Sequence, residues 1–188
     1  MRIAIFGGTF DPIHSAHLIV AREAADRFSL DRVLFIPAGN PPLKEASAPY
    51  EDRYRMVELA CSEDPRFVPS RLEEGREKSY SLHTIQRVRA QIPPQDQLFF
   101  VIGADAFAEI ESWYRWPEVV ASVEFIVVTR PGHAYAAPPG ACVHRLDTVA
   151  LPVSSSEIRQ ALSRGEIPPE LPARVAQYIR ERRLYQQA

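Results

Sequence analysis

Short apolar runs alternate along this chain with segments in which apolar residues recur every three or four positions. The runs predict buried strands at 3–6, 33–36, 98–102 and 125–128, with weaker strands at 67–68 and 143–149. The recurring pattern predicts helices covering about 18–28, 54–61, 81–90, 154–162 and 171–179. Repeated strand-then-helix order favours an α/β fold, a Rossmann-like doubly wound parallel sheet with helices on both faces. A small helical part completes the chain from about residue 154.

The composition excludes several classes of protein but does not identify the function. The chain has 188 residues, 46% hydrophobic and 24% charged, which predicts one globular domain over 1–188. No apolar stretch approaches the roughly 20 residues that span a bilayer, so we expect no membrane association. Two cysteines without close pairing indicate a reducing, cytoplasmic setting. A net charge of −2 does not suggest nucleic-acid binding, and any anionic substrate must be held by local groups.

One candidate site begins where the first strand ends. Residues 7–18 read GGTFDPIHSAHL and lead into a helix, the place where N–H groups and the helix dipole bind phosphates. The segment is neither G-x-x-x-x-G-K-[ST] nor G-x-G-x-x-G. It carries two histidines three positions apart, and a helix that starts near Ile13 would put both on one face. His14 and His17, together with backbone amides, would then clamp a polyphosphate.

The same histidines have simpler interpretations. A histidine near a helix start is most often a cap or a surface residue. An H-x-x-H pair can also hold zinc, which needs a third and usually a fourth ligand. The other histidines, His83, His133 and His144, stand alone, without acidic or cysteine companions at ligand spacing. We therefore expect no metal-ligating residues in the chain.

A second candidate site lies near the other end of the chain. Residues 154–159 read SSSEIR, and Ser154 and Glu157 have the spacing of a capping box. A capped helix would explain the segment fully. Three hydroxyls and Arg159 one turn into the helix also describe an anion site, because a guanidinium fork suits phosphate oxygens.

Together the two segments resemble the signatures of a known superfamily. The first is similar to the [H/T]-x-G-H motif of nucleotidyltransferases, in the G-G-[ST]-F-D-P-x-H form typical of bacterial nicotinate-nucleotide adenylyltransferases. The second resembles that family's [IV]-S-S-[ST]-x-[IV]-R, and the resemblance covers essentially the whole chain. It implies that ATP and nicotinate mononucleotide give deamido-NAD and pyrophosphate, in NAD biosynthesis, with Mg²⁺ bridging the phosphates. It also implies His14 and His17 as catalytic residues.

The resemblance extends to residues between the two motifs. The ATP-binding residues it implies are Gly8, Thr9, Phe10, His14, His17, Gly103, Asp105, Ser154, Ser155, Ser156 and Arg159. The acceptor-binding residues are Lys44, Ser79, Tyr80, Ser81, Trp113, Tyr114 and Arg130. Asp105 would bind ribose, or would merely cap a helix. Trp113 would stack on the pyridine ring, or would merely pack in the core. The amides of Ser79-Tyr80-Ser81 would receive the nicotinate carboxylate and reject an amide.

Other interpretations stay open. Phosphopantetheine adenylyltransferase shares the first motif, but typically carries threonine where His14 stands, and other nucleotidyltransferases of the superfamily are alternatives. From another class, the chain could be a non-catalytic nucleotide sensor. Departures from the family pattern at Ala16, Leu43 and His83 would then be signs of drift. A homo-oligomer is a further possibility that the sequence leaves open.

Overall fold

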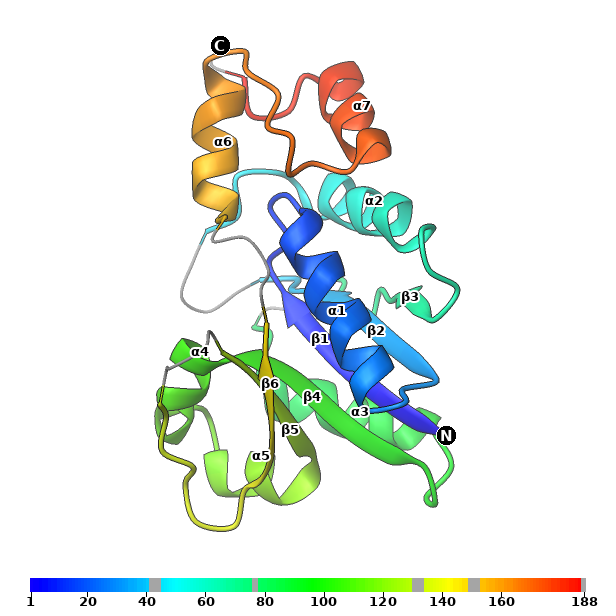
Figure 1. Cartoon of the computed structure of the whole chain (residues 1–188), viewed down its shortest axis with the longest axis vertical. Coiled ribbons are helices and arrows are strands. Elements are labelled where there is room, and N and C mark those ends of the chain that lie inside the picture. Colours follow the sequence, from blue (N-terminus) through cyan, green and yellow to red (C-terminus); the bar gives the residue numbers. More distant parts are fainter. Residues whose placement is uncertain (41–44, 76–77, 130–133, 149–152, 187–188) are drawn as a thin grey trace.

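The computed structural model describes residues 1–40, 45–75, 78–129, 134–148 and 153–186 (Figure 1). Its strands are β1 (Arg2–Gly8), β2 (Arg32–Pro37), β3 (Phe67–Pro69), β4 (Gln97–Gly103), β5 (Glu124–Thr129) and β6 (Cys142–Asp147). Its helices are α1 (Ser15–Arg27), α2 (Tyr50–Cys61), α3 (Ser81–Gln91), α4 (Ala104–Ala108), α5 (Trp116–Ser122), α6 (Ser155–Ser163) and α7 (Ala173–Arg182), with a 3₁₀ turn at Ile110–Ser112.

The six strands form one parallel sheet in the order β3-β2-β1-β4-β5-β6. This is the Rossmann-like order predicted from the alternation of strands and helices, so the fold class is confirmed. The chain runs outward from β1 to β3, returns to β4 beside β1, and then runs outward to β6. The switch point therefore lies between β1 and β4, where ligands of such sheets bind beyond the carboxyl ends of the strands.

Alternate residues of each strand face opposite layers of helices, because successive side chains of a strand point to opposite faces. One apolar core joins Ala4, Phe35, Phe99 and Ile126 to α1, α2, α6 and α7. The other joins the neighbouring strand residues, such as Phe100 on β4, to α3, α4 and α5. The terminal helices α6 and α7 thus share the core of α1 and α2, and they lie together at the upper end of the molecule (Figure 1).

The structure corrects some local expectations. Helix α1 begins at Ser15, with His14 as its extended N-cap residue, two positions after the expected start near Ile13. The weak strands exist as β3 and β6. The short helices α4 and α5 were not predicted, because five and seven residues are too few to display a helical period. No described helix is long and apolar enough to cross a membrane.

Candidate active site

His14 and His17 lie against each other at the start of α1, with ring centroids 3.8 Å apart and planes tilted by 30°. The backbone N–H of His14 donates a hydrogen bond to Nδ1 of His17 over 3.2 Å. Since Nδ1 accepts, a neutral His17 carries its proton on Nε2. His17 therefore has one N–H donor, at Nε2, which points away from the His14 backbone N–H.

Both imidazoles are neutral at neutral pH. Burial lowers the pKa of His14 to about 4, and burial together with the nearby His14 lowers the pKa of His17 well below its usual value. Nδ1 of His14 is buried and has no hydrogen-bond partner. A buried polar atom of this kind is costly to leave unpaired, which suits a group that waits for a ligand.

The loop before α1 is shaped by aromatic packing. Phe10 is buried in the left-handed region, with φ of 50°, and its ring meets the edge of His17 at 5.1 Å between centroids. A Cβ added to Gly8 would lie 3.1 Å from the Phe10 ring, closer than ordinary contacts allow. Glycine at this position thus lets Phe10 fold back over the end of β1. Thr9, between them, is half-buried.

The second motif docks onto the first. Ser154 caps α6 in a capping box with Glu157, as predicted. The hydroxyl of Ser155 donates to the carbonyl of Pro12 over 3.0 Å. The guanidinium of Arg159 donates to the carbonyl of Asp11 over 2.7 Å and to the hydroxyl of Ser156 over 3.2 Å. Residues from opposite ends of the chain therefore meet at the loop that leads to His14.

Asp11 is the centre of this junction, a role that sequence reasoning missed. Its buried carboxylate accepts from the backbone N–H groups of Ser47 and Ala48 over 2.6 and 3.1 Å. It also accepts from the Tyr185 hydroxyl over 2.6 Å. The carboxylate thus joins the first motif to the loop before α2 and to the C-terminal segment.

Arg53 is a second residue that the sequence did not single out. It is fully buried in α2 and donates to the carbonyls of Thr9, Ala38 and Ala48, at 2.8, 2.9 and 3.2 Å. Burial lowers its pKa. A charged arginine in a helical segment reads as a surface residue in sequence, so no local signal could have found it. It holds the ends of β1 and β2 in place.

A cavity of about 300 Å³ opens at the carboxyl ends of β1, β2 and β4, on the α3 side of the sheet. Six of the residues expected to bind ATP or the acceptor line it: Gly8, Thr9, Ser79, Ser81, Gly103 and Trp113. Phe6 also lines the cavity, and its ring lies 6.0 Å from that of His17. The cavity and the histidine pair therefore both adjoin Phe6, near the end of β1.

Side-chain contacts order the cavity wall. The hydroxyl of Ser79 accepts from the backbone N–H groups of Gly39 and Asn40, over 3.1 and 3.3 Å, which fixes the segment before α3. Glu73 also lines the cavity and was not predicted. Its Oε1 accepts from Thr84 over 2.5 Å and from Arg87 over 3.2 Å, while the buried Oε2 has no partner.

The remaining predicted residues fall in different places. Tyr80 and Tyr114 have ring centroids 4.8 Å apart, and Tyr114 is exposed. Asp105 is exposed in the first turn of α4, a helix that begins immediately after Gly103. Lys44 and Arg130 lie outside the described residues.

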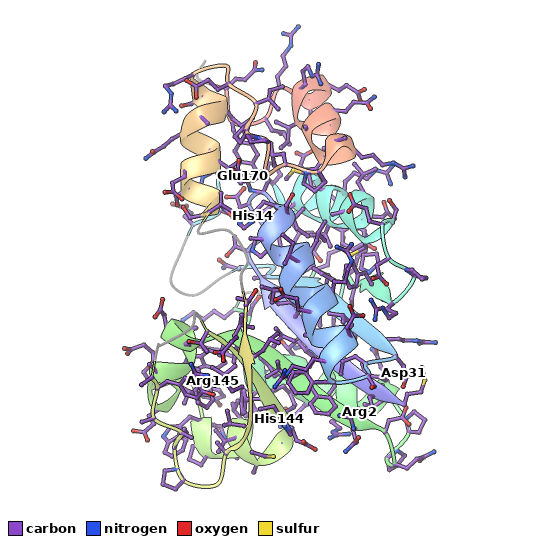
Figure 2. The ribbon with its side chains drawn as sticks, in the orientation of Figure 1. Arg2, His14, Asp31, His144, Arg145 and Glu170 are labelled. Carbon is purple, nitrogen blue, oxygen red and sulfur yellow. The ribbon has the colours of Figure 1, made fainter. Side chains whose placement is uncertain are left out.

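One expectation about histidines is wrong. His144 was expected to stand alone, without acidic or cysteine companions. In the structure its Nε2 lies 2.7 Å from the carboxylate of Glu124 and 4.0 Å from the sulfur of Cys142. Figure 2 shows His144 well away from His14, toward the other end of the molecule. Cys142 and His144 lie two positions apart on β6, and strand pairing adds Glu124, which the sequence could not reveal.

Comparison with known proteins places the chain among close relatives. Residues 5–161 match the cytidylyltransferase-like family. A probable nicotinate-nucleotide adenylyltransferase of Solibacter usitatus is 58% identical, with 98% of this chain and 100% of that protein aligned. One of Thermus thermophilus is 42% identical, again with 98% and 100% aligned.

Solved structures agree on the fold. The Plasmodium falciparum nicotinic acid mononucleotide adenylyltransferase complexed with NaAD superposes with a TM-score of 0.81, at 20% identity, over 98% of this chain and 97% of that one. A putative nicotinate-nucleotide adenylyltransferase from Vibrio parahaemolyticus gives a TM-score of 0.73 at 21% identity, over 100% and 98%. With both signature motifs, the near-complete alignments and the shared sheet, the chain belongs to the nicotinate-nucleotide adenylyltransferase family of cytidylyltransferase-like nucleotidyltransferases.

Proposed function

We propose that this nucleotidyltransferase transfers the adenylyl group of ATP to nicotinate mononucleotide, giving deamido-NAD and pyrophosphate in NAD biosynthesis. The observation that carries the proposal is the docking of the SSSEIR segment onto the first motif, through Ser155 to Pro12 and Arg159 to Asp11. It fixes the Arg159 guanidinium against the loop that leads into the two histidines, and we infer that guanidinium and imidazoles act on one ligand beyond the carboxyl ends of the strands.

The donor side of the site suits a triphosphate. His17 offers Nε2–H, the positive end of the α1 dipole favours an anion, and Arg159 supplies a fixed positive charge. A shallow hollow of about 470 Å³ lies beside Arg159, bordered also by Ser156 and Ser47. We place the β- and γ-phosphates at this hollow and the α-phosphate at the histidines.

The acceptor side suits a carboxylated ring. Helix α3 begins at Ser81 on the cavity wall, so its first N–H groups are free to receive an anion. Trp113 lines the same cavity and offers an aromatic face for a pyridine ring. A nicotinamide in this position would turn its NH₂ toward N–H donors and leave buried groups unpaired. We therefore expect nicotinate mononucleotide to be preferred.

Mg²⁺ would be held mainly by the substrate. The carboxylate of the first motif, Asp11, already accepts three protein hydrogen bonds, so it is not available as a ligand. Mg²⁺ retains water and commonly binds through substrate phosphates with few protein ligands. When bound, it would neutralise charge on the phosphate oxygens. The chain's own contribution is to hold the two anionic substrates in place.

The chemistry that follows is a direct displacement. A 5′-phosphate oxygen of nicotinate mononucleotide attacks the α-phosphorus of ATP, the bond from that phosphorus to the bridging oxygen breaks, and pyrophosphate leaves with the electron pair. Orientation and stabilisation of the developing charge are the protein's roles. His17 and His14 donate to the α-phosphate oxygens, and Arg159 stabilises the departing pyrophosphate.

Pyrophosphate release tests the proposal. The purified chain is mixed with ATP, Mg²⁺ and one acceptor: nicotinate mononucleotide, nicotinamide mononucleotide or phosphopantetheine. We expect fast release and deamido-NAD formation with the first acceptor only. Release with phosphopantetheine alone would assign the chain to the sister activity. ATP binding without release for any acceptor would make it a nucleotide sensor.

A further inference from the structure

Glu124, Cys142 and His144 bring three different metal-ligating atoms together on the α1 face of the sheet. Their carboxylate oxygen, sulfur and imidazole nitrogen lie within 4.8 Å of one another. The individual separations are 2.7 Å from oxygen to nitrogen, 3.8 Å from sulfur to oxygen and 4.0 Å from sulfur to nitrogen. The cluster plays no part in the proposed adenylyl transfer.

The backbone fixes this arrangement. Glu124 and Cys142 are the first residues of β5 and β6 and are direct partners in the parallel pairing. His144, two positions after Cys142, points to the same face of its strand. Its ring is held between Phe28 and Phe99, with centroids 5.6 and 5.8 Å away. Two apolar rings therefore contact the imidazole, while its Nε2 faces the Glu124 carboxylate and the Cys142 sulfur.

The geometry is close to that of a tetrahedral metal. With metal–ligand distances near 2.3 Å for sulfur and 2.0–2.2 Å for nitrogen and oxygen, the ligand atoms around Zn²⁺ lie roughly 3.4–3.6 Å apart. Each observed separation differs from that range by about 0.7 Å or less. Cys142 is exposed, and Glu124 and His144 are about one-third exposed, so small side-chain rotations suffice.

From this geometry we infer that Glu124, Cys142 and His144 form a binding site for a zinc-like divalent cation, with a fourth position open to water or to another ligand. Thiolate, imidazole and carboxylate together select Zn²⁺ over Mg²⁺, which takes oxygen ligands. The site lies at the amino ends of β5 and β6. It therefore lies at the opposite end of the strands from the switch-point cavity. It is separate from any Mg²⁺ that binds with the substrates.

Two features moderate the affinity. Partial burial and the Glu124 carboxylate raise the pKa of the Cys142 thiol, and a bound cation must displace that proton. The Arg2 guanidinium stacks over the Phe99 ring at 4.8 Å, which adds positive charge beneath the site. We expect weaker binding than at a closed structural site with four protein ligands.

Cobalt titration provides the test. Co²⁺ added to the purified full-length chain should give the near-ultraviolet thiolate charge-transfer band and the intense visible bands of a tetrahedral site, and Zn²⁺ should abolish both. Changing an outer-shell partner typically weakens metal binding 10–100-fold, so losing a direct ligand should weaken it about 100-fold or more. We expect this for Cys142→Ser and for His144→Ala. Adenylyl transfer by both variants should be unchanged, which shows that they fold.

The two cysteines give a matched control. Cys61 is buried in α2, so Cys61→Ala should keep the charge-transfer band. Zn²⁺ should raise the thermal unfolding midpoint of the wild type and of Cys61→Ala, but not of Cys142→Ser. Absence of the band at millimolar Co²⁺, or its persistence in Cys142→Ser, would overturn the inference.

Discussion

The hydroxyl of Tyr185 donates a hydrogen bond to Oδ1 of Asp11 over 2.6 Å, joining residues 174 positions apart. Asp11 belongs to the loop that positions His14, and its carbonyl also accepts from Arg159. The C-terminal segment thus holds the loop of the first motif in place. Burial and the neighbouring Asp11 carboxylate raise the pKa of Tyr185, so the phenol stays protonated and keeps donating at neutral pH.

Tyr185→Phe should loosen this junction. Removing a hydrogen bond to a buried carboxylate costs about 1.5–3 kcal/mol of stability. If the loop of the first motif binds ATP as proposed, the KM for ATP should rise about 5- to 10-fold, while the KM for nicotinate mononucleotide stays near its wild-type value. Initial rates of pyrophosphate release, with each substrate varied in turn, measure both.

Tyr178→Phe is the matched control. Tyr178 donates to Asp52 over 2.7 Å, a bond that links α7 to α2 without touching the first motif. We expect a comparable loss of stability and no change in the KM for ATP. If both variants affect that KM equally, the Tyr185 bond only stabilises the fold.

Two substitutions of His17 should distinguish the roles of its two ring nitrogens. Asparagine can keep the acceptor that Nδ1 offers to the His14 N–H, but it cannot reproduce the Nε2 donor, whereas glutamine reaches the Nε2 position and gives up the acceptor. Losing one preorganised donor costs about 10²–10³ in kcat. We therefore expect His17→Asn to lose that much, as His17→Ala would, and His17→Gln to lose less.

Single-turnover rates and the unfolding midpoint of each variant check this assignment. All three variants should stay folded, because the His17 ring makes only edge contacts with Phe6 and Phe10 and one face contact with His14. His17→Ala and His17→Gln, which also lose the hydrogen bond from the His14 N–H, should unfold about 1 kcal/mol more easily than His17→Asn. A kcat of His17→Asn within fivefold of the wild type would remove Nε2 from the mechanism.

His14 should make the fold sensitive to acid. Its pKa is about 4 in the folded chain, against an ordinary value near 6.5. The unfolded state therefore binds more protons between these values, so stability is complete above about pH 6.5 and falls as the pH drops toward 4. For this shift the loss between pH 7 and pH 5 is about 2 kcal/mol.

Urea unfolding at pH 7 and pH 5, followed by circular dichroism, measures the loss. His14→Asn should lose about 2 kcal/mol less than the wild type over the same interval, while His17, whose pKa is lowered too, still contributes. Identical losses in the two proteins would show that His14 is not the group that titrates.

The sheet was predictable because its strands are continuous apolar runs closed by glycine, as at Gly8 and Gly103, and because helices separate them. Both motifs were also local, and each shows a helix start in sequence. The sequence could not show which residues that are far apart in the chain come into contact in the fold. Asp11 was visible in the first motif, but its partner Tyr185 was not, since only the packing of the C-terminal segment brings them together.

The Glu124–Cys142–His144 cluster illustrates the same limit. Metal-binding motifs are recognised by spacing along one segment, whereas this cluster depends on which strands are neighbours and in which register. The weak apolar pattern of β6 predicted a strand, but it did not show which strand β6 would pair with. A search for ligating residues at the starts of neighbouring strands would have found it once the strand order was known.

Trp113 and Trp116 allow the acceptor pocket to be tested against ordinary core packing. Both indoles are half-buried against the same apolar core, but only Trp113 is among the residues that line the cavity. If its ring stacks on the pyridine, Trp113→Leu removes about 0.5–1.5 kcal/mol of aromatic interaction, so the KM for nicotinate mononucleotide should rise up to about 10-fold. The KM for ATP should stay unchanged.

Trp116→Leu should cost similar stability and leave both KM values near wild type. Steady-state kinetics with each substrate varied, together with thermal unfolding of both variants, separate binding from folding. Equal effects of the two substitutions on acceptor KM would mean that Trp113 supports the pocket wall without contacting the ring. An unchanged acceptor KM in Trp113→Leu would place the pyridine elsewhere in the cavity, because a lost stacking partner must weaken binding of a ring that it contacts.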